Sequence, residues 1–332
     1  MNTYTANRRT FLKQGAALGT GLLLSGPFAF AAKKPDSRFG GVQIGAITYS
    51  FRSMPGSAEQ LLDYCVRCGI SAIELMGDPA EAFAGSPAGL MPPMLPPPPG
   101  SGPPKFTPEM RKAFEERAMK ARPWREGVGM DKFIELRKMF NKAGVTIYAY
   151  KPDALNERST DGEINYAMRA AKALGATSVT VELPRDPAHS KRLGDIAAGH
   201  QMYVGYHAHT QATDTAWDEA LAQSPWNSLN LDCGHYIAAG GSNTKESLLA
   251  LIESKSSRIT SMHIKDRQTK DHGAANLEWG KGDTPIREIL QLMKKNKYKF
   301  PATIELEYEV PAGSDAVAEV AKCVGFARSA LS

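Results

Sequence analysis

The sequence predicts an α/β protein that folds as one closed barrel of eight parallel strands, a (β/α)8 or TIM barrel. Two observations support this fold class. Eight short apolar runs alternate with eight amphipathic stretches, and together these segments fill about 290 residues. The runs are rich in Val, Ile, Thr and Tyr, and turn-forming residues bound them, as is typical of buried parallel strands. A doubly wound open sheet is the alternative, because hydrophobic periodicity does not report whether a sheet closes.

The eight predicted strands are residues 43–49, 72–75, 146–150, 178–182, 203–207, 228–232, 259–265 and 302–307. The eight predicted helices are residues 58–68, 130–143, 164–174, 187–199, 216–223, 246–254, 284–296 and 316–331. Glycines follow three of these helices directly, at Gly69, Gly144 and Gly175. A glycine there provides the left-handed residue that ends a helix, so each of the three helices is expected to stop before the next strand.

The composition and charge narrow the class of protein. With 42% hydrophobic and 23% charged residues, the chain is of globular type, which excludes a disordered chain or a disulfide scaffold. The formal net charge is +5, but Arg8, Arg9 and Lys13 account for three of these charges. When the three are taken from the 40 Lys and Arg, 37 basic and 35 acidic residues remain. The basic excess is therefore no sign of a nucleic-acid partner.

Residues 1–32 are predicted to be an export signal. The pair Arg8 and Arg9 precedes an apolar stretch, residues 15–30, and an Ala-Phe-Ala site at residues 29–31. This pattern resembles a twin-arginine signal, so we expect a periplasmic or secreted protein. No later segment offers the roughly 18 apolar residues that span a bilayer, so no stable membrane insertion is expected after signal cleavage. An uncleaved membrane anchor is the alternative.

An insertion at residues 87–125 interrupts the barrel domain, which is predicted at residues 40–332. Ten of the 22 prolines lie in residues 87–108, a composition that favours extended polyproline II over a helix or inner strand. The charged segment at residues 109–125 is predicted to be a surface helix. In a barrel this insertion follows the second strand, over the active-site face. A lid, a docking arm and a solvated loop are the alternatives for its role.

Ionisable side chains end most of the predicted strands, where barrels of this type carry their functional residues. They are Glu74, Lys151, Glu182, His207, Asp232, His263 and Glu305. Recurring carboxylates and imidazoles are the composition of a divalent-metal site. Each of these residues taken alone is equally typical of a solvated or ion-paired side chain, so the prediction rests on the whole set.

Five sequence words carry a resemblance to a known family. They are VTVELP, YHAHT, LNLDCGHY, SMHIKDRQ and TIELEYE, in this order on predicted strands 4 to 8. Together they resemble the xylose isomerase-like TIM-barrel superfamily, the sugar phosphate isomerases and epimerases. The resemblance runs from about Gly41 to the C-terminus, apart from the insertion. It implies one divalent metal ion, held by Glu182, Asp232, His263 and Glu305.

Several further roles follow for single residues. Glu307 is a rival to Glu305, because residues two apart on a strand point to the same face. The resemblance implies that Glu182 and Glu305 are also the acid–base pair. It places His207 and His235 near the substrate. Glu74, Lys265 and Arg267 are further candidates for substrate contacts, with an ordinary ion-pair cluster as the alternative for the last two.

The ligand set suits a hard ion, so Mn²⁺, Mg²⁺ or Co²⁺ is expected, with Zn²⁺ as a further candidate. The implied activity is isomerisation or epimerisation of a sugar by proton transfer through a metal-stabilised enediolate. The expected substrate is an unphosphorylated sugar or keto-sugar, because the sequence contains no glycine-rich phosphate-binding loop. A homo-oligomer stays open as a further partner.

Two other functions remain as alternatives. A lyase or dehydratase acting on keto-glycosides or inososes would use the same metal site. An exported carbohydrate-binding barrel would have no catalysis at all. Abasic-site endonucleases share the barrel, but no nucleic-acid partner is expected, because Glu74 and Lys151 stand where those enzymes have histidine ligands and the charge without residues 1–32 is nearly neutral.

Overall fold

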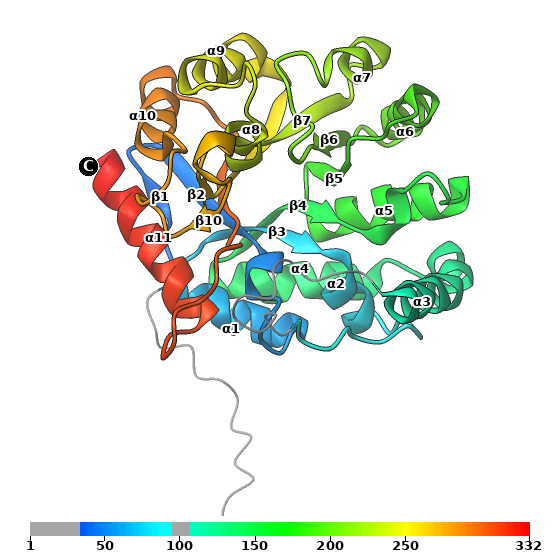
Figure 1. Cartoon of the computed structure of the whole chain (residues 1–332). Coiled ribbons are helices and arrows are strands. Elements are labelled where there is room, and N and C mark those ends of the chain that lie inside the picture. The colour runs from blue at the N-terminus through cyan, green and yellow to red at the C-terminus, as the bar shows by residue number, and fades with distance from the viewer. Residues whose placement is uncertain (1–33, 95–106) are drawn as a thin grey trace, which may run out of the picture. The chain divides into compact units, whose positions relative to one another are not determined.

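The computed structural model describes residues 34–94 and 107–332. The predicted export signal at residues 1–32 and residues 95–106 of the predicted insertion lie outside the described residues. Eight parallel strands close into a barrel (Figure 1). They are β2 (Val42–Ile47), β3 (Ala72–Met76), β4 (Thr146–Lys151), β5 (Ser178–Glu182), β6 (Tyr203–His207), β7 (Asn227–Asp232), β8 (Ile259–Ile264) and β11 (Ala302–Ile304). Because β2 pairs with both β3 and β11, the predicted TIM barrel is confirmed and the open-sheet alternative is wrong.

Helices surround the strands (Figure 1). Eight correspond to the predicted ones: α1 (Ala58–Cys68), α4 (Asp131–Ala143), α5 (Asp161–Leu174), α6 (Pro187–His200), α7 (Asp218–Gln223), α9 (Lys245–Lys255), α10 (Ile286–Asn296) and α11 (Ala316–Leu331). Two short helices that the sequence did not predict, α2 (Gly77–Phe83) and α8 (Cys233–Ala239), directly follow β3 and β7. In the part of the chain that the structure describes, no helix is long and apolar enough to cross a membrane.

The remaining elements are small. Strand β1 (Arg38–Phe39) pairs with β2 in antiparallel orientation, and β9 (Asp266–Arg267) pairs with β10 (Asn276–Leu277). The 3₁₀ helices are η1 (Thr48–Phe51), η2 (Asp153–Leu155), η3 (Ser256–Arg258) and η4 (Lys270–His272). The β9–β10 pair belongs to the loop that follows β8, so it lies at the C-terminal end of that barrel strand.

The predicted helix ends are confirmed at the three glycines. Gly69, Gly144 and Gly175 have φ angles of 81°, 88° and 83°, the left-handed conformation that glycine adopts without steric cost. At the other end of α5, the side chain of Thr160 accepts the backbone N–H of Glu163, whose own side chain accepts the N–H of Thr160. These local signals are reliable because they depend only on neighbours in the sequence.

The last barrel strand is shorter than predicted. It ends at Ile304, where the sequence pattern predicted pairing to residue 307. Beyond it, the backbone N–H of Leu306 donates to Ser50 Oγ at 3.0 Å, and Arg52 Nη1 donates to the Leu306 carbonyl at 2.6 Å. Side chains thus take the backbone groups that a neighbouring strand would otherwise bind. Glu305 and Glu307 consequently lie just past the C-terminal end of β11.

The charged part of the insertion forms the helix α3 (Pro108–Gly127), in agreement with the predicted helix. It begins with Thr107 as N-cap and proline at the first turn, a favourable helix start. Near its other end, Arg125 is only 4% exposed. The Arg125 guanidinium donates two hydrogen bonds to Glu81 of α2, at 2.8 and 3.0 Å, and one to Glu163 of α5, at 3.2 Å. Buried ion pairs therefore fasten α3 to the barrel.

Candidate metal centre

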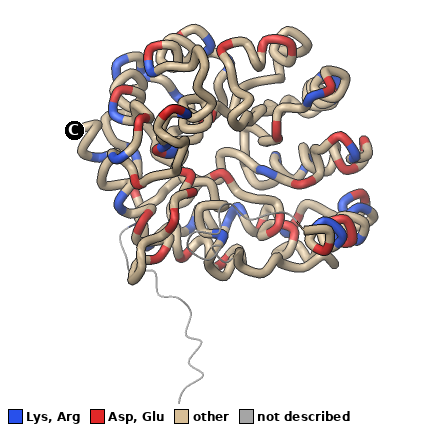
Figure 2. The backbone as a smooth tube through the Cα atoms, viewed as in Figure 1, with Lys and Arg blue, Asp and Glu red and all other residues tan. Residues whose placement is uncertain are grey.

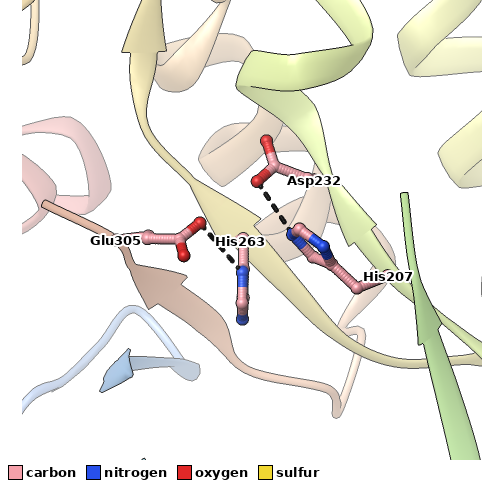
Figure 3. Close-up of side chains that lie close together, drawn as sticks. All are labelled: His207, Asp232, His263 and Glu305. Atoms are coloured by element: carbon pink, nitrogen blue, oxygen red, sulfur yellow. Dashed lines mark hydrogen bonds and ion pairs between the residues drawn. The ribbon is translucent and has the colours of Figure 1, made fainter. Parts of the chain in front are cut away.

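Four buried side chains converge at the C-terminal ends of β6, β7, β8 and β11 (Figure 3). They are His207, Asp232, His263 and Glu305, and one potential ligand atom from each lies within 4.8 Å of the others. We call this set the central group. The four strands are consecutive in the sheet and parallel, so their ends meet at one rim of the barrel. Three of the four predicted metal ligands are in this group, together with His207, which the sequence analysis placed near the substrate.

Glu182 lies beside the central group. It is the last residue of β5 and its side chain is 49% exposed. Its Oε2 is 3.1 Å from His207 Nδ1, and its Oε1 accepts a hydrogen bond from Lys151 Nζ at 2.9 Å. Burial raises the pKa of the Glu182 carboxyl, but His207 and Lys151 outweigh burial and hold that pKa far below its usual value. Glu182 with His207 and His209 makes a second set of three close ligand atoms.

Lys265 holds the carboxylates of the central group together. Its Nζ lies 2.9 Å from Asp232 Oδ2, 2.6 Å from Glu305 Oε2 and 2.7 Å from Glu307 Oε2. Burial alone would lower the pKa of Lys265, but these three carboxylates raise it, so the ammonium stays charged. Glu307 is bound to Lys265 but is not a member of the central group. The geometry thus brings Glu305 rather than its rival into the candidate metal centre.

Glu74 supports His263 from inside the barrel. It is fully buried on β3, and its Oε2 lies 2.9 Å from His263 Nε2, while Glu305 Oε2 lies 3.1 Å from the other ring nitrogen. Burial lowers the pKa of His263, but Glu305 and Glu74 together raise it to about 10. A carboxylate on one ring nitrogen is the usual support for a histidine whose other nitrogen binds a metal. This geometry places Glu74 to orient His263, and the predicted contact of Glu74 with the substrate stays a prediction.

His235 and Arg267 lie on the other side of Asp232. The Asp232 side chain caps α8 by accepting the His235 backbone N–H at 2.7 Å. Arg267 Nη1 donates to His235 Nδ1 at 2.6 Å, which leaves the ring proton on Nε2. Burial lowers the pKa of His235 to about 3, so the ring is neutral. Its Nε2 is buried without a hydrogen-bond partner among the described residues, and is therefore available to a ligand.

The donor set fits one divalent cation. Five carboxylates, from Glu74, Glu182, Asp232, Glu305 and Glu307, surround three cationic side chains, Lys151, Lys265 and Arg267. Without an ion, the raised pKa values of His207 and His263 let protons on these imidazoles offset the excess of carboxylates, and a bound cation would take the place of those protons. In addition, Glu74 Oε1 and Asn230 Oδ1 are buried without a partner among the described residues. Oxygen-rich ligands with imidazole suit the predicted ions.

Replacing Lys265 by Met is expected to tighten the binding of Mn²⁺ about tenfold. The substitution removes a positive charge that competes for the oxygens of Asp232 and Glu305. Isothermal titration calorimetry of the metal-free protein with Mn²⁺ measures the change. The control is Lys299→Met, which removes an exposed lysine before the start of β11, at the end of that strand opposite to Glu305, and should leave the affinity unchanged. Weaker Mn²⁺ binding by Lys265→Met would show that Lys265 supports the ion instead of competing with it.

Two residues of the site were not among the predicted site residues. Lys151 ends β4 and binds Glu182, so its position at a strand end was the available signal. Asn230 Nδ2 donates to Glu74 Oε2 at 3.0 Å and lies 3.3 Å from His263 Nε2. Asn230 precedes Asp232 by two residues on β7 and so faces the barrel interior with it. That spacing was visible in the sequence, but a single Asn carries no metal or acid–base signal.

The fold and the site define a class: a closed α/β barrel with a buried carboxylate and imidazole cluster at the C-terminal ends of its strands. A model of the xylose isomerase-like TIM barrel family matches residues 110–325, about two thirds of the chain. The chain therefore belongs to this family, as the sequence words indicated. A search of curated protein sequences finds no match.

Solved structures with the same fold share little sequence with this chain. A sugar phosphate isomerase/epimerase from Parabacteroides distasonis is 15% identical, covers 88% of this chain and 96% of its own, and superimposes with a TM-score of 0.54. The probable 3-DHS dehydratase AsbF from Bacillus anthracis is also 15% identical, with 84% and 97% covered and a TM-score of 0.57. The IOLI protein with a bound zinc atom is 16% identical, with 87% and 99% covered and a TM-score of 0.57.

Proposed function

We propose that this protein is a divalent-metal-dependent isomerase or epimerase that acts on an unphosphorylated sugar or keto-sugar outside the cytoplasm. The observation that carries the proposal is the placement of two ionised carboxylates, Glu305 in the central group and Glu182 beside it. Glu182 ends β5 and Glu305 follows β11, and β6, β7 and β8 lie between these strands in the sheet. Two carboxylates on different sides of one site are what proton removal and proton return require.

Different residues of the site are proposed to carry out metal binding, proton removal and proton return. When bound by the central group, a divalent ion would polarise a sugar carbonyl and so acidify the neighbouring C–H. Glu182, ionised and half-exposed, is placed to accept that proton. Glu305 is the second proton carrier. Return of the proton to the opposite face of the same carbon gives an epimer, and return to the neighbouring carbonyl carbon gives an isomer. Lys151 and the Nε2–H of His235 offer hydrogen bonds that orient sugar hydroxyls.

Other features support the proposal without deciding the reaction. One structural neighbour is described as a sugar phosphate isomerase/epimerase, and another is described with a bound zinc atom. The Arg8–Arg9 signal supports action in the periplasm or outside the cell, where phosphorylated sugars are scarce. A lyase or dehydratase would use the same residues, and one structural neighbour is described as a probable dehydratase. The products of the reaction separate these outcomes.

The test is proton exchange in deuterated water. The Mn²⁺-loaded protein is incubated with a panel of ketoses, aldoses and keto-sugars, and NMR follows the products. We expect deuterium at the carbon beside the carbonyl, in an isomer or epimer. Glu182→Gln should slow the exchange by at least about 100-fold, because it removes the proton acceptor. The exposed Glu309→Gln is the matched control and should exchange at the wild-type rate.

Two results would contradict this function. An unsaturated product without an isomer or epimer would identify a lyase or dehydratase. Binding of sugars with no exchange in any of them would favour the non-catalytic carbohydrate-binding barrel. Either result leaves the metal centre itself to be tested by metal titration.

A further inference from the structure

A large pocket opens beside the candidate metal centre, between α3 and the C-terminal ends of β3, β4 and β5. Its volume is about 960 Å³. Phe114 and Ala118 of α3 form part of one wall, and Lys151 and Glu182 belong to the opposite side. We call it the α3 pocket. Since Glu182 also contacts His207, the pocket is continuous with the proposed catalytic site. This volume is near the upper end of the range for small-molecule binding sites. It is much larger than the volume of one hexose.

The charges of the α3 pocket favour a neutral ligand. The lining has six cationic side chains and seven carboxylates. Five of the cations already bind carboxylates, in the pairs Arg117–Asp78, Arg122–Glu163, Arg125–Glu81, Lys151–Glu182 and Arg158–Glu115. Basic and acidic residues accordingly alternate along α3 (Figure 2). Among the six cations, only Arg185 forms no ion pair with the described residues. Asp153 and Glu157 also form no ion pair with the described residues, and they add two negative charges to the lining. An anionic ligand would find little net attraction here.

A buried hydroxyl also indicates that the pocket is built for a ligand. Thr180 lines the pocket and is only 1% exposed. Its Oγ1 has no hydrogen-bond partner among the described residues. Thr180 precedes Glu182 by two residues on β5, so both side chains face the same side of the strand. A buried hydroxyl without a partner is unfavourable, and a hydroxyl of a bound ligand would satisfy it.

We propose that the α3 pocket is a subsite for the non-reacting part of the substrate, and that the substrate is a neutral disaccharide or another glycoside. This inference rests on the proposed function, because it places the reacting sugar at Glu182 and the central group. The second sugar unit lies against α3, where fixed ion pairs offer oriented donors and acceptors to its hydroxyl groups. One wall of this subsite comes from the insertion.

Calorimetric titration of the Mn²⁺-loaded protein tests this subsite by binding. The ligands are the ketose disaccharides lactulose, maltulose and isomaltulose, with D-fructose and fructose 6-phosphate for comparison. We expect at least one disaccharide to bind tenfold or more tightly than D-fructose. Ala118→Trp fills the pocket from an exposed position of α3 and should reduce the ratio of disaccharide to fructose affinity by at least fivefold. Ala113→Trp, on the same helix but outside the lining, is the matched control and should keep the wild-type ratio.

The outcomes separate this inference from the proposed function. Equal affinity for fructose and all three disaccharides, or an unchanged ratio in Ala118→Trp, overturns the subsite even if proton exchange occurs on free ketoses. Tighter binding of fructose 6-phosphate than of any disaccharide overturns the neutral-ligand assignment. Tight disaccharide binding that Ala118→Trp weakens, without proton exchange, supports the subsite and contradicts the proposed catalysis. Thermal melting of both Trp variants verifies that α3 remains folded.

Discussion

Replacing Asp232 by Asn is expected to weaken Mn²⁺ binding by at least 100-fold, about 2.7 kcal/mol, and to abolish measurable turnover. Asp232 is fully buried and bridges the site: its Oδ2 lies 2.9 Å from Lys265 Nζ and 3.2 Å from His207 Nε2. The substitution removes one negative charge from the central group and keeps the shape of the side chain. The amide oxygen of the introduced asparagine can still accept the His235 backbone N–H, so the start of α8 is preserved.

The measurement is calorimetric titration with Mn²⁺, together with metal content after dialysis. The exposed Asp271→Asn is the control for a lost surface carboxylate and should bind Mn²⁺ like the wild type. Comparison of Glu305→Gln with Glu307→Gln then identifies the last ligand. Glu305→Gln should cost at least 100-fold in affinity and Glu307→Gln less than tenfold, since only Glu305 belongs to the central group. Wild-type Mn²⁺ affinity in Asp232→Asn would exclude this cluster as the metal centre.

Replacing Arg125 by Met is expected to lower the free energy of unfolding by about 3–5 kcal/mol. The guanidinium is buried between Glu81 and Glu163, and removing it leaves Glu81 without an ion-pair partner among the described residues. Tyr166 still donates to Glu81 Oε1 at 3.2 Å, and Arg122 Nε still donates to Glu163 Oε2 at 3.0 Å. Burial already raises the pKa of Glu81, so without Arg125 this carboxyl is expected to take up a proton.

Urea denaturation followed by circular dichroism measures this loss of stability. The control on the same helix is Arg111→Met, which removes an exposed arginine and should change the free energy of unfolding by less than about 0.5 kcal/mol, as is usual for surface substitutions. Because the ion pairs of Arg125 hold α3 against α2 and α5, Arg125→Met should expose α3 to limited proteolysis before the barrel. A loss below about 1 kcal/mol would show that α3 docks by other contacts.

The barrel and most of the side chains at its rim could be predicted from the amino-acid sequence alone. Strand composition and the glycines at Gly69, Gly144 and Gly175 depend on neighbours within a few residues, so pattern alone predicts them. The ends of the predicted strands placed Asp232 and His263 at the rim, where barrels of this type carry their functional side chains. The family words then named Glu305 as a candidate ligand, and the central group contains all three.

The contacts between these side chains depend on the three-dimensional fold and could not be predicted from the sequence. Glu182 lies at the edge of the site and His207 lies within the central group, although both end neighbouring strands. Lys265 binds carboxylates of that group and Glu74 binds its His263 imidazole, contacts that the sequence did not predict. The α3 pocket joins an insertion helix to three distant strands. Spacing along the chain sets which face a side chain takes, but distances across a barrel depend on closure, stagger and packing of segments far apart in sequence.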